Sequence, residues 1–188
     1  CAARGVAVCN GPPPMVEPTA DIAWALLLAT ARRLREGIRV AESGDWTGYD
    51  SQLLLGHRLH GGTLLVVGAG RIGAAVARRA IGWNMRVLYT ARTPKPALEA
   101  SPISATKVAL EDGLPLADAV VLTISLDHST RHLIDAAALA LMKPSSVLVN
   151  VSRGPVVDEV ALANALSEKR ILGAGLDVYE HEPKIERR

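Results

Sequence analysis

The stretch that decides the fold is Thr63-Leu-Leu-Val-Val-Gly-Ala-Gly-Arg-Ile-Gly73. Its apolar, β-branched first half predicts a buried strand over 64–67, and a helix is expected over 72–81. Glycines in a GxGxxG spacing between a strand and a helix are typical of the turn that binds the diphosphate of a dinucleotide. A plain structural turn is the simpler alternative. The predicted cofactor contacts in this stretch are Gly68, Gly70, Arg71, Ile72 and Gly73.

Strands and helices alternate downstream of this stretch. Such alternation implies parallel pairing of the strands, because each connection returns to the same end of the sheet through a helix. The predicted fold class is therefore α/β, a doubly wound parallel sheet of the Rossmann type that binds dinucleotides. The further strands are expected over 85–89, 107–110, 119–124, 146–150 and 172–178, and the further helices over 136–142 and 158–168.

The first third of the chain lacks this alternation. Three consecutive prolines, 12–14, favour an extended path. A helix is predicted from Thr19, as its N-cap, to Arg35, and a glycine-rich loop over 43–62. The middle of this helix is apolar on every side, which fits core packing and a subunit interface equally well. The predicted division is 1–18, a connector from a substrate domain; 19–62, a helix and loop at a dimer interface; 63–183, the dinucleotide-binding domain; and 184–188, the start of a further segment.

Composition excludes several classes of protein. The 188 residues are 49% hydrophobic and 21% charged, which suits a buried core and not a disordered chain. The 21 basic and 19 acidic residues give no broad charge for binding nucleic acid or a membrane surface. The longest apolar stretch, 22–31, is too short to span a bilayer. Two cysteines cannot form a disulfide framework, which favours the cytoplasm. We expect neither nucleic-acid nor membrane partners, and no metal site.

The end of the second predicted strand bears on the choice of cofactor. An NAD site normally carries an acid about 20 residues after the glycines, but Tyr89-Thr-Ala-Arg-Thr-Pro-Lys95 has no carboxylate and the next one is Glu99. Hydroxyl and cationic groups favour a 2′-phosphate, so NADP(H) is predicted. NAD(H) stays an alternative, because Arg92 stacked on the adenine would suit either cofactor. The further predicted cofactor contacts are Thr90, Arg92, Thr93, Ser125, Val151 and Asp177.

Two later strands end in groups suited to a substrate. Arg153 follows the fifth strand, and Glu182 follows the sixth. The carboxyl ends of parallel strands meet at one edge of the sheet, where ligands bind. An arginine there suits a substrate carboxylate, and an acid there can orient a proton donor. On spacing alone, an ordinary surface charge is the simpler interpretation of both residues.

Four motifs in order resemble the D-isomer-specific 2-hydroxyacid dehydrogenases, from about Gly5 to Pro183. Within that family, Thr19–Arg33 and the segment after Tyr89 are most similar to glyoxylate/hydroxypyruvate reductases. The motifs are Gly-Ala-Gly-Arg-Ile-Gly (68–73), Met-Lys-Pro (142–144), Val-Asn-Val-Ser-Arg-Gly-Pro-Val-Val (149–157) and Gly-Ala-Gly-Leu-Asp-Val (173–178).

The resemblance implies an activity and several residue roles. The activity is NAD(P)H-dependent reduction of a small 2-oxo acid, such as glyoxylate or hydroxypyruvate, to the D-2-hydroxy acid. Arg153 would bind the carboxylate and carbonyl of the substrate, and Glu182 would pair with the catalytic histidine. Asp177 would bind the nicotinamide carboxamide. The helix from Thr19 would help to form a homodimer.

One element of the family pattern is absent. The family's general acid is a histidine in a Pro-His-Gly type of motif after the Glu-Pro pair, and no histidine in these 188 residues follows a proline. His181, next to Glu182, is interpreted as a surface residue. The chain is therefore expected to be a cofactor domain without its acid, inactive alone. An NAD(H)-sensing corepressor on the same fold is an alternative, and a chain that only binds nucleotide and dimerises is another. The five histidines are His57, His60, His128, His132 and His181.

Overall fold

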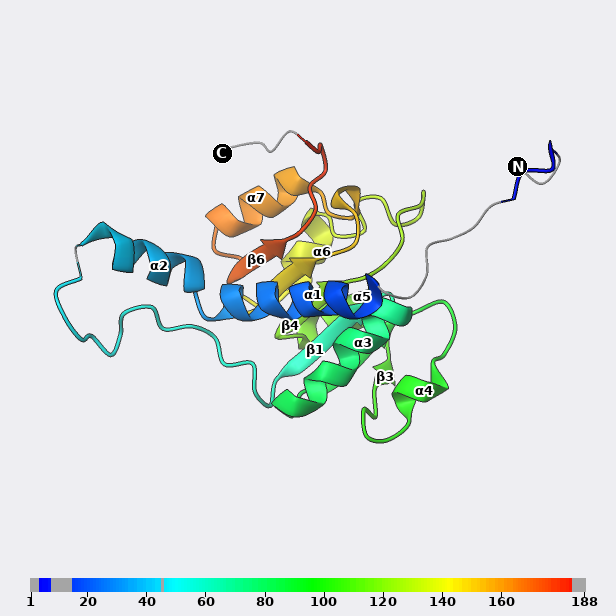
Figure 1. Cartoon of the computed structure of the whole chain (residues 1–188), viewed down its shortest axis with the longest axis horizontal. Coiled ribbons are helices and arrows are strands. Elements are labelled where there is room, and N and C mark those ends of the chain that lie inside the picture. The colour runs from blue at the N-terminus through cyan, green and yellow to red at the C-terminus, as the bar shows by residue number, and fades with distance from the viewer. Residues whose placement is uncertain (1–3, 8–14, 45, 184–188) are drawn as a thin grey trace.

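The computed structural model describes residues 4–7, 15–44 and 46–183. Their centre is a six-stranded sheet in the order β3-β2-β1-β4-β5-β6, and every pair of neighbouring strands is parallel (Figure 1). This order is that of a dinucleotide-binding doubly wound sheet, so the predicted fold class is confirmed. The strands are β1 (Thr63–Val67), β2 (Arg86–Thr90), β3 (Thr106–Lys107), β4 (Ala119–Leu122), β5 (Val147–Asn150) and β6 (Gly173–Leu176).

Helices cover both faces of the sheet and divide the core in two. Successive residues of β1 alternate between the halves: Leu64 and Val66 pack with α1 and α3, and Leu65 and Val67 pack with α6 and α7. Burial on both faces explains why β1 is apolar throughout. The helices are α1 (Val16–Ala31), α2 (Leu34–Ser43), α3 (Arg71–Arg79), α4 (Pro96–Glu99), α5 (Leu110–Gly113), α6 (Ala136–Leu141) and α7 (Glu159–Ser167), with 3₁₀ turns at Ala80–Trp83, Leu114–Leu116 and Gly154–Val156.

The start and end of the first helix differ from the prediction. Thr19 is not the N-cap, because α1 begins at Val16 and the Thr19 hydroxyl donates to Met15 O at 2.6 Å from inside the helix. Pro18 is accommodated in the first turn, where a missing N–H leaves no hydrogen bond unmade. The predicted helix is also two helices, since Arg33 adopts a left-handed φ of 54° that separates α1 from α2. The segment after α2 is irregular, as predicted, and extends away from the sheet (Figure 1).

One side of α1 is part of the core. Trp24 is 6% exposed, and its indole N–H donates to Val76 O of α3 at 3.1 Å. Another side lies so close to β6 that a Cβ on Gly173 would be 2.7 Å from the Thr30 methyl group. Core packing is therefore confirmed for the sides of α1 that face α3 and β6. Ile22, at 38% exposure, leaves part of the helix facing outward.

Three predicted strands are at least two residues shorter than expected, among them β6, which covers Gly173–Leu176 instead of 172–178, and two segments cannot be compared. β4 ends at Leu122 instead of residue 124, because Thr123 and Ile124 pack against the glycine turn after β1. β3 has two residues, and the chain from residue 110 forms α5. The prolines at 12–14 and the segment 184–188 lie outside the described residues. In the described part of the chain, no helix combines the length and the apolar content needed to cross a membrane.

Asp118 joins three segments at the amino-terminal edge of the sheet. Its carboxylate accepts hydrogen bonds from Thr63 N at 2.7 Å and from Lys143 Nζ at 2.8 Å, and His57 Nε2 lies 4.0 Å away. Burial opposes ionisation of this carboxyl, but the hydrogen bonds from Lys143 and Thr63 outweigh it and hold the pKa of Asp118 below its ordinary value. Lys143, which belongs to one of the four motifs, therefore stabilises the fold at the edge opposite the candidate site.

The variant Asp118→Asn should unfold more easily by about 1–3 kcal/mol at neutral pH, because it loses a hydrogen-bonded ion pair. The stabilisation due to a lowered pKa is complete above the unfolded value of about 3.9 and is lost as the pH falls through the folded value. The difference between wild type and variant should therefore shrink below about pH 4. Urea unfolding at several pH values measures this, with the exposed Asp112→Asn as control. A difference that stays constant down to acid pH would contradict it.

Candidate active site

The glycine turn after β1 has two glycines required by packing and one that leaves open space. Gly68 has a φ of +96°, and a Cβ on it would lie 2.8 Å from the backbone of Ile124. A Cβ on Gly73 would lie 2.4 Å from Gly68 O. A Cβ on Gly70, which caps α3, would meet nothing within 4 Å. A structural turn accounts for Gly68 and Gly73 but not for Gly70, whereas a diphosphate bound at the helix N-terminus needs that open backbone.

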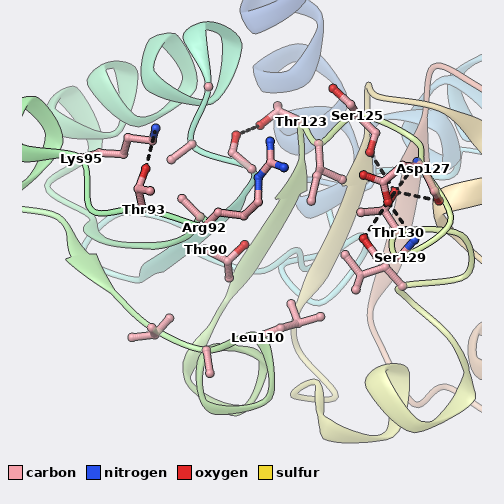
Figure 2. Close-up of a pocket in the computed structure, with 18 residues that line it drawn as sticks. Thr90, Arg92, Thr93, Lys95, Leu110, Thr123, Ser125, Asp127, Ser129 and Thr130 are labelled. Carbon is pink, nitrogen blue, oxygen red and sulfur yellow. Dashed lines mark hydrogen bonds between the residues drawn. The ribbon is translucent and has the colours of Figure 1, made fainter.

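A cleft of about 850 Å³ opens beside this turn, within the usual range for a small-molecule site (Figure 2). It is bounded by the turn, by the segment after β2 and by the segment after β4. Six of the predicted cofactor contacts line it: Gly68, Gly70, Thr90, Arg92, Thr93 and Ser125. The cleft is also lined by residues that were not among the predicted contacts, including Lys95, Val108, Asp127 and Thr130. Lys95 ends the segment quoted after Tyr89, and no motif marks the other three.

The other predicted contacts lie outside the lining of this cleft. Arg71, Ile72 and Gly73 form the first turn of α3, directly behind Gly70. Val151 follows β5 and is buried. Asp177 follows β6, and its backbone N–H donates to Asn150 O at 3.0 Å. The cleft is thus formed by the β1, β2 and β4 ends of the sheet edge, and Val151 and Asp177 continue that edge.

The two ends of the cleft differ in charge. Figure 2 shows Lys95, Thr93 and Arg92 at one end and Asp127, Ser129 and Thr130 at the other. Within the part of the chain that the structure describes, neither Arg92 nor Lys95 forms an ion pair with an acid. Hydrogen bonds from the Ser129 hydroxyl and backbone, followed by those of Thr130, lower the pKa of Asp127. The cationic end is therefore available to an anionic group, and the acid at the far end already has its donors.

A buried asparagine shapes the loop that carries Arg153. Asn150 is 1% exposed, and its amide group donates to Arg153 O at 3.0 Å and accepts from Ser152 N and Oγ at 3.0 and 2.7 Å. Arg153 itself is exposed, and its guanidinium donates to Ser152 O at 2.6 Å. Sequence reasoning assigned no role to Asn150. Its position within a motif next to Arg153 was the available signal.

The loops of Arg153 and Glu182 are in contact. A Cβ on Gly154 would lie 1.9 Å from Tyr179 O, so only glycine allows this approach. Glu182 is exposed and accepts from Tyr179 N at 2.7 Å. His181 is exposed too, as interpreted from the sequence. The structure therefore brings the two predicted catalytic residues to one edge on touching loops.

Glu180 anchors this second loop, a role that no sequence signal indicated. Its carboxylate accepts from His132 Nε2 at 2.6 Å and from Arg131 Nη2 at 2.9 Å, and its side chain is 7% exposed. Burial favours the neutral acid, but the hydrogen bond from His132 outweighs it and the pKa of Glu180 is lowered. His132 therefore binds Glu180 and helps to hold the loop that follows β6.

A family model described as the NAD-binding domain of D-isomer specific 2-hydroxyacid dehydrogenases matches residues 24–188. The chain belongs to this family. The resemblance inferred from the four motifs is thereby confirmed, and the domain is one that binds a nicotinamide dinucleotide.

Relatives in the 2-hydroxyacid dehydrogenase family extend the comparison. The glyoxylate reductase of Thermococcus gammatolerans is 48% identical over 184 residues, which are 96% of this chain and 55% of the relative. The crystal structure of a glyoxylate reductase from Paecilomyes thermophila has 37% identity and a TM-score of 0.88, with 98% of this chain and 55% of that chain covered. The D-lactate dehydrogenase of Aquifex aeolicus, complexed with NAD and lactic acid, has 30% identity and a TM-score of 0.87, with 97% and 54% covered. The chain spans about half the length of the curated relatives it matches.

The substitution Gly73→Ala tests whether close packing of α3 creates this 2-hydroxyacid dehydrogenase cofactor site. The added methyl group must push α3 away from β1, which should cost about 1–3 kcal/mol and weaken NADPH binding about tenfold or more. Gly82→Ala is the matched control, because a Cβ there would meet nothing within 4 Å. Urea unfolding and a fluorescence titration with NADPH measure both effects. Equal behaviour of the two variants would show that the approach at Gly73 is not needed.

Proposed function

We propose that this chain is the cofactor-binding part of a reductase that converts a small 2-oxo acid of the glyoxylate or hydroxypyruvate type into the D-2-hydroxy acid with NADPH. The observation that carries the proposal is the open backbone at Gly70 beside a cleft that Arg92 and Lys95 also line; among the described residues, neither cation has an acidic partner. Family membership and the likeness to glyoxylate reductases support the reaction class. We place the protein in the cytoplasm, where its two cysteines would stay reduced.

The cofactor would be held at several points along the sheet edge. The backbone at Gly70 and the first turn of α3, with Arg71, Ile72 and Gly73, suit the diphosphate. The 2′-phosphate would lie by Arg92 and its neighbours Thr90, Thr93 and Lys95. Ser125, Val151 and Asp177 would lie toward the nicotinamide, and Asp177 would bind its carboxamide. When bound, the cofactor supplies the hydride that adds to the carbonyl carbon of the substrate.

Arg153 and Glu182 would act on the substrate side. The Arg153 guanidinium suits the carboxylate of a 2-oxo acid and the negative charge that develops on its carbonyl oxygen. That oxygen must also receive a proton as the hydride arrives. Glu182 would pair with a protonated histidine for this step. Among the described residues, no histidine is hydrogen-bonded to Glu182, which accepts from Tyr179 N. His132 is bound to Glu180 instead.

We further propose that the active form is a homodimer. The segment formed by α2 and the residues that follow it extends away from the sheet in Figure 1 and has exposed apolar side chains. Ile38, Trp46 and Leu55 are 48%, 63% and 60% exposed. Apolar side chains gathered on an extended arm are typical of a surface covered by a partner. A second copy of the chain would bury them.

The variant Ala91→Asp should reverse the cofactor preference. Wild type should bind NADPH more tightly than NADH, because the loop offers cations and hydroxyls to a 2′-phosphate. An added carboxylate beside Thr90 would repel that phosphate and accept a hydrogen bond from a 2′-hydroxyl. Fluorescence titrations of wild type and Ala91→Asp with NADPH and with NADH measure the four affinities. Equal affinity of wild type for the two cofactors would sink the proposed preference, and failure to bind either would sink the proposed cofactor site.

Arg153→Lys should not be a conservative change. Lysine keeps the charge but loses the planar pair of donors, so kcat/KM for NADPH oxidation with glyoxylate should fall by about 10²–10³. The measurement uses the protein as its gene encodes it, with glyoxylate and hydroxypyruvate as substrates. Arg170→Lys, a surface arginine paired with Glu168, is the control. Unchanged kcat/KM in Arg153→Lys would assign the arginine a structural role only.

A further inference from the structure

A buried phenol closes the loop at the cationic end of the cleft. Tyr89, the residue before the end of β2, is 0% exposed. Its hydroxyl accepts a hydrogen bond from Lys95 N at 2.7 Å and donates one to Glu99 Oε1 at 2.5 Å. A buried hydroxyl needs such partners, since leaving one unmatched costs free energy. Tyr89 thus links β2 to both ends of α4, because Lys95 is the N-cap of that helix and Glu99 is its last residue.

The loop between Tyr89 and Lys95 is held at each end. At its start, Thr90 O accepts hydrogen bonds from the backbone N–H groups of Gly68 and Ala69, both at 3.2 Å. At its end, Lys95 O accepts from Leu98 N at 2.8 Å, which fixes Lys95 at the first turn of α4. Of the exposed residues between these points, Arg92 and Thr93 line the cleft. Their placement therefore depends on the closure that Tyr89 makes.

The same hydroxyl engages the nearest acid in the sequence. Glu99 is the first carboxylate after Tyr89, and it does not line the cleft. Burial, and then the hydrogen bond to Glu99, raise the pKa of Tyr89, so the phenol stays protonated and acts as the donor. A carboxylate at the cationic end would accept from a 2′-hydroxyl and repel a 2′-phosphate. Glu99 instead accepts a hydrogen bond from Tyr89 and does not line the cleft, so it does not compete with Arg92 and Lys95 at the cationic end.

We propose that Tyr89 and Glu99 are positioning residues for cofactor choice: together they hold Arg92, Thr93 and Lys95 toward the cleft and so favour a 2′-phosphorylated adenosine. The inference rests on the proposed function, because it presupposes that the cleft receives the adenosine half of NADPH. Neither residue touches the cofactor, since neither lines the cleft. The effect of each is transmitted through Lys95 N and the loop it closes.

The variant Tyr89→Phe keeps the buried ring and removes the hydroxyl alone. It should lose about tenfold in NADPH affinity and about twofold or less in NADH affinity, because the loop that meets the 2′-phosphate loosens while the glycine turn is unchanged. Fluorescence titration of the 188-residue chain measures both constants. Calorimetry with adenosine 2′,5′-bisphosphate and 5′-AMP isolates the phosphate. Tyr49→Phe, which deletes the same hydroxyl from a side chain 92% exposed outside the cleft, is the control.

Changes at Glu99 test the pair without altering the core. Glu99→Ala removes the acceptor and should lower NADPH affinity about threefold, with NADH unchanged. Glu99→Gln retains an oxygen that can accept from the phenol and should keep the wild-type ratio or raise it. If circular dichroism shows that Tyr89→Phe does not fold, the comparison of Glu99→Ala with Glu99→Gln tests the inference in its place. An equal loss in Glu99→Gln and Glu99→Ala would overturn the inference.

The outcomes separate this inference from the function it rests on. Equal binding of NADPH and NADH by wild type would overturn the proposed cofactor preference and the inference with it. A ratio of NADPH to NADH affinity in Tyr89→Phe that equals the wild-type ratio would overturn the inference alone. An equal loss for both cofactors in Tyr89→Phe would also overturn it, because the hydroxyl would then support the whole cleft and not the phosphate end.

Discussion

The close approach of α3 to β1 is the constraint on which the cleft depends. The Thr123 hydroxyl donates to Gly68 O at 2.7 Å, and a Cβ on Gly73 would lie 2.4 Å from that same oxygen. Three segments therefore converge on one carbonyl group: the turn, the helix and the end of β4. With the helix fixed so near the strand, its first turn begins directly after the open backbone at Gly70. The position of the cleft follows from this packing.

The sequence was most informative where a local pattern determines a local structure. The apolar run of β1 and the glycines after it predicted a strand, a turn and a helix, because steric demands at Gly68 and Gly73 leave no other residue. The boundaries of the first helix were less predictable. The left-handed Arg33 divides the predicted helix in two, and Thr19 lies inside a helix that it was expected to begin. At the end of α1, Ala31 O accepts a hydrogen bond from His57 N, a partner distant in the sequence that no local pattern indicates.

The predicted site residues divide in the same way. Arg153 and Glu182 could be proposed from the sequence because each follows a predicted strand, Arg153 within the 149–157 motif and Glu182 directly before Pro183. Asn150 and Glu180, which hold their loops, act through partners that are 2 to 49 residues away in the sequence. The partners of Glu180 are Arg131 and His132, and no spacing rule connects them to it. A site's charged groups are therefore easier to predict from sequence than the polar groups that support them.

The supporting network also explains how a nearly neutral chain keeps a cationic edge. Asp118 is bound to Lys143 on the opposite edge, Glu180 to Arg131 and His132, and Glu99 to the Tyr89 phenol. None of these three acids lines the cleft. In the described part of the chain, Arg92, Lys95 and Arg153 consequently have no acid within ion-pairing distance. A net charge of +2 says little about ligands, whereas this distribution of paired and unpaired charges favours an anionic cofactor and an anionic substrate.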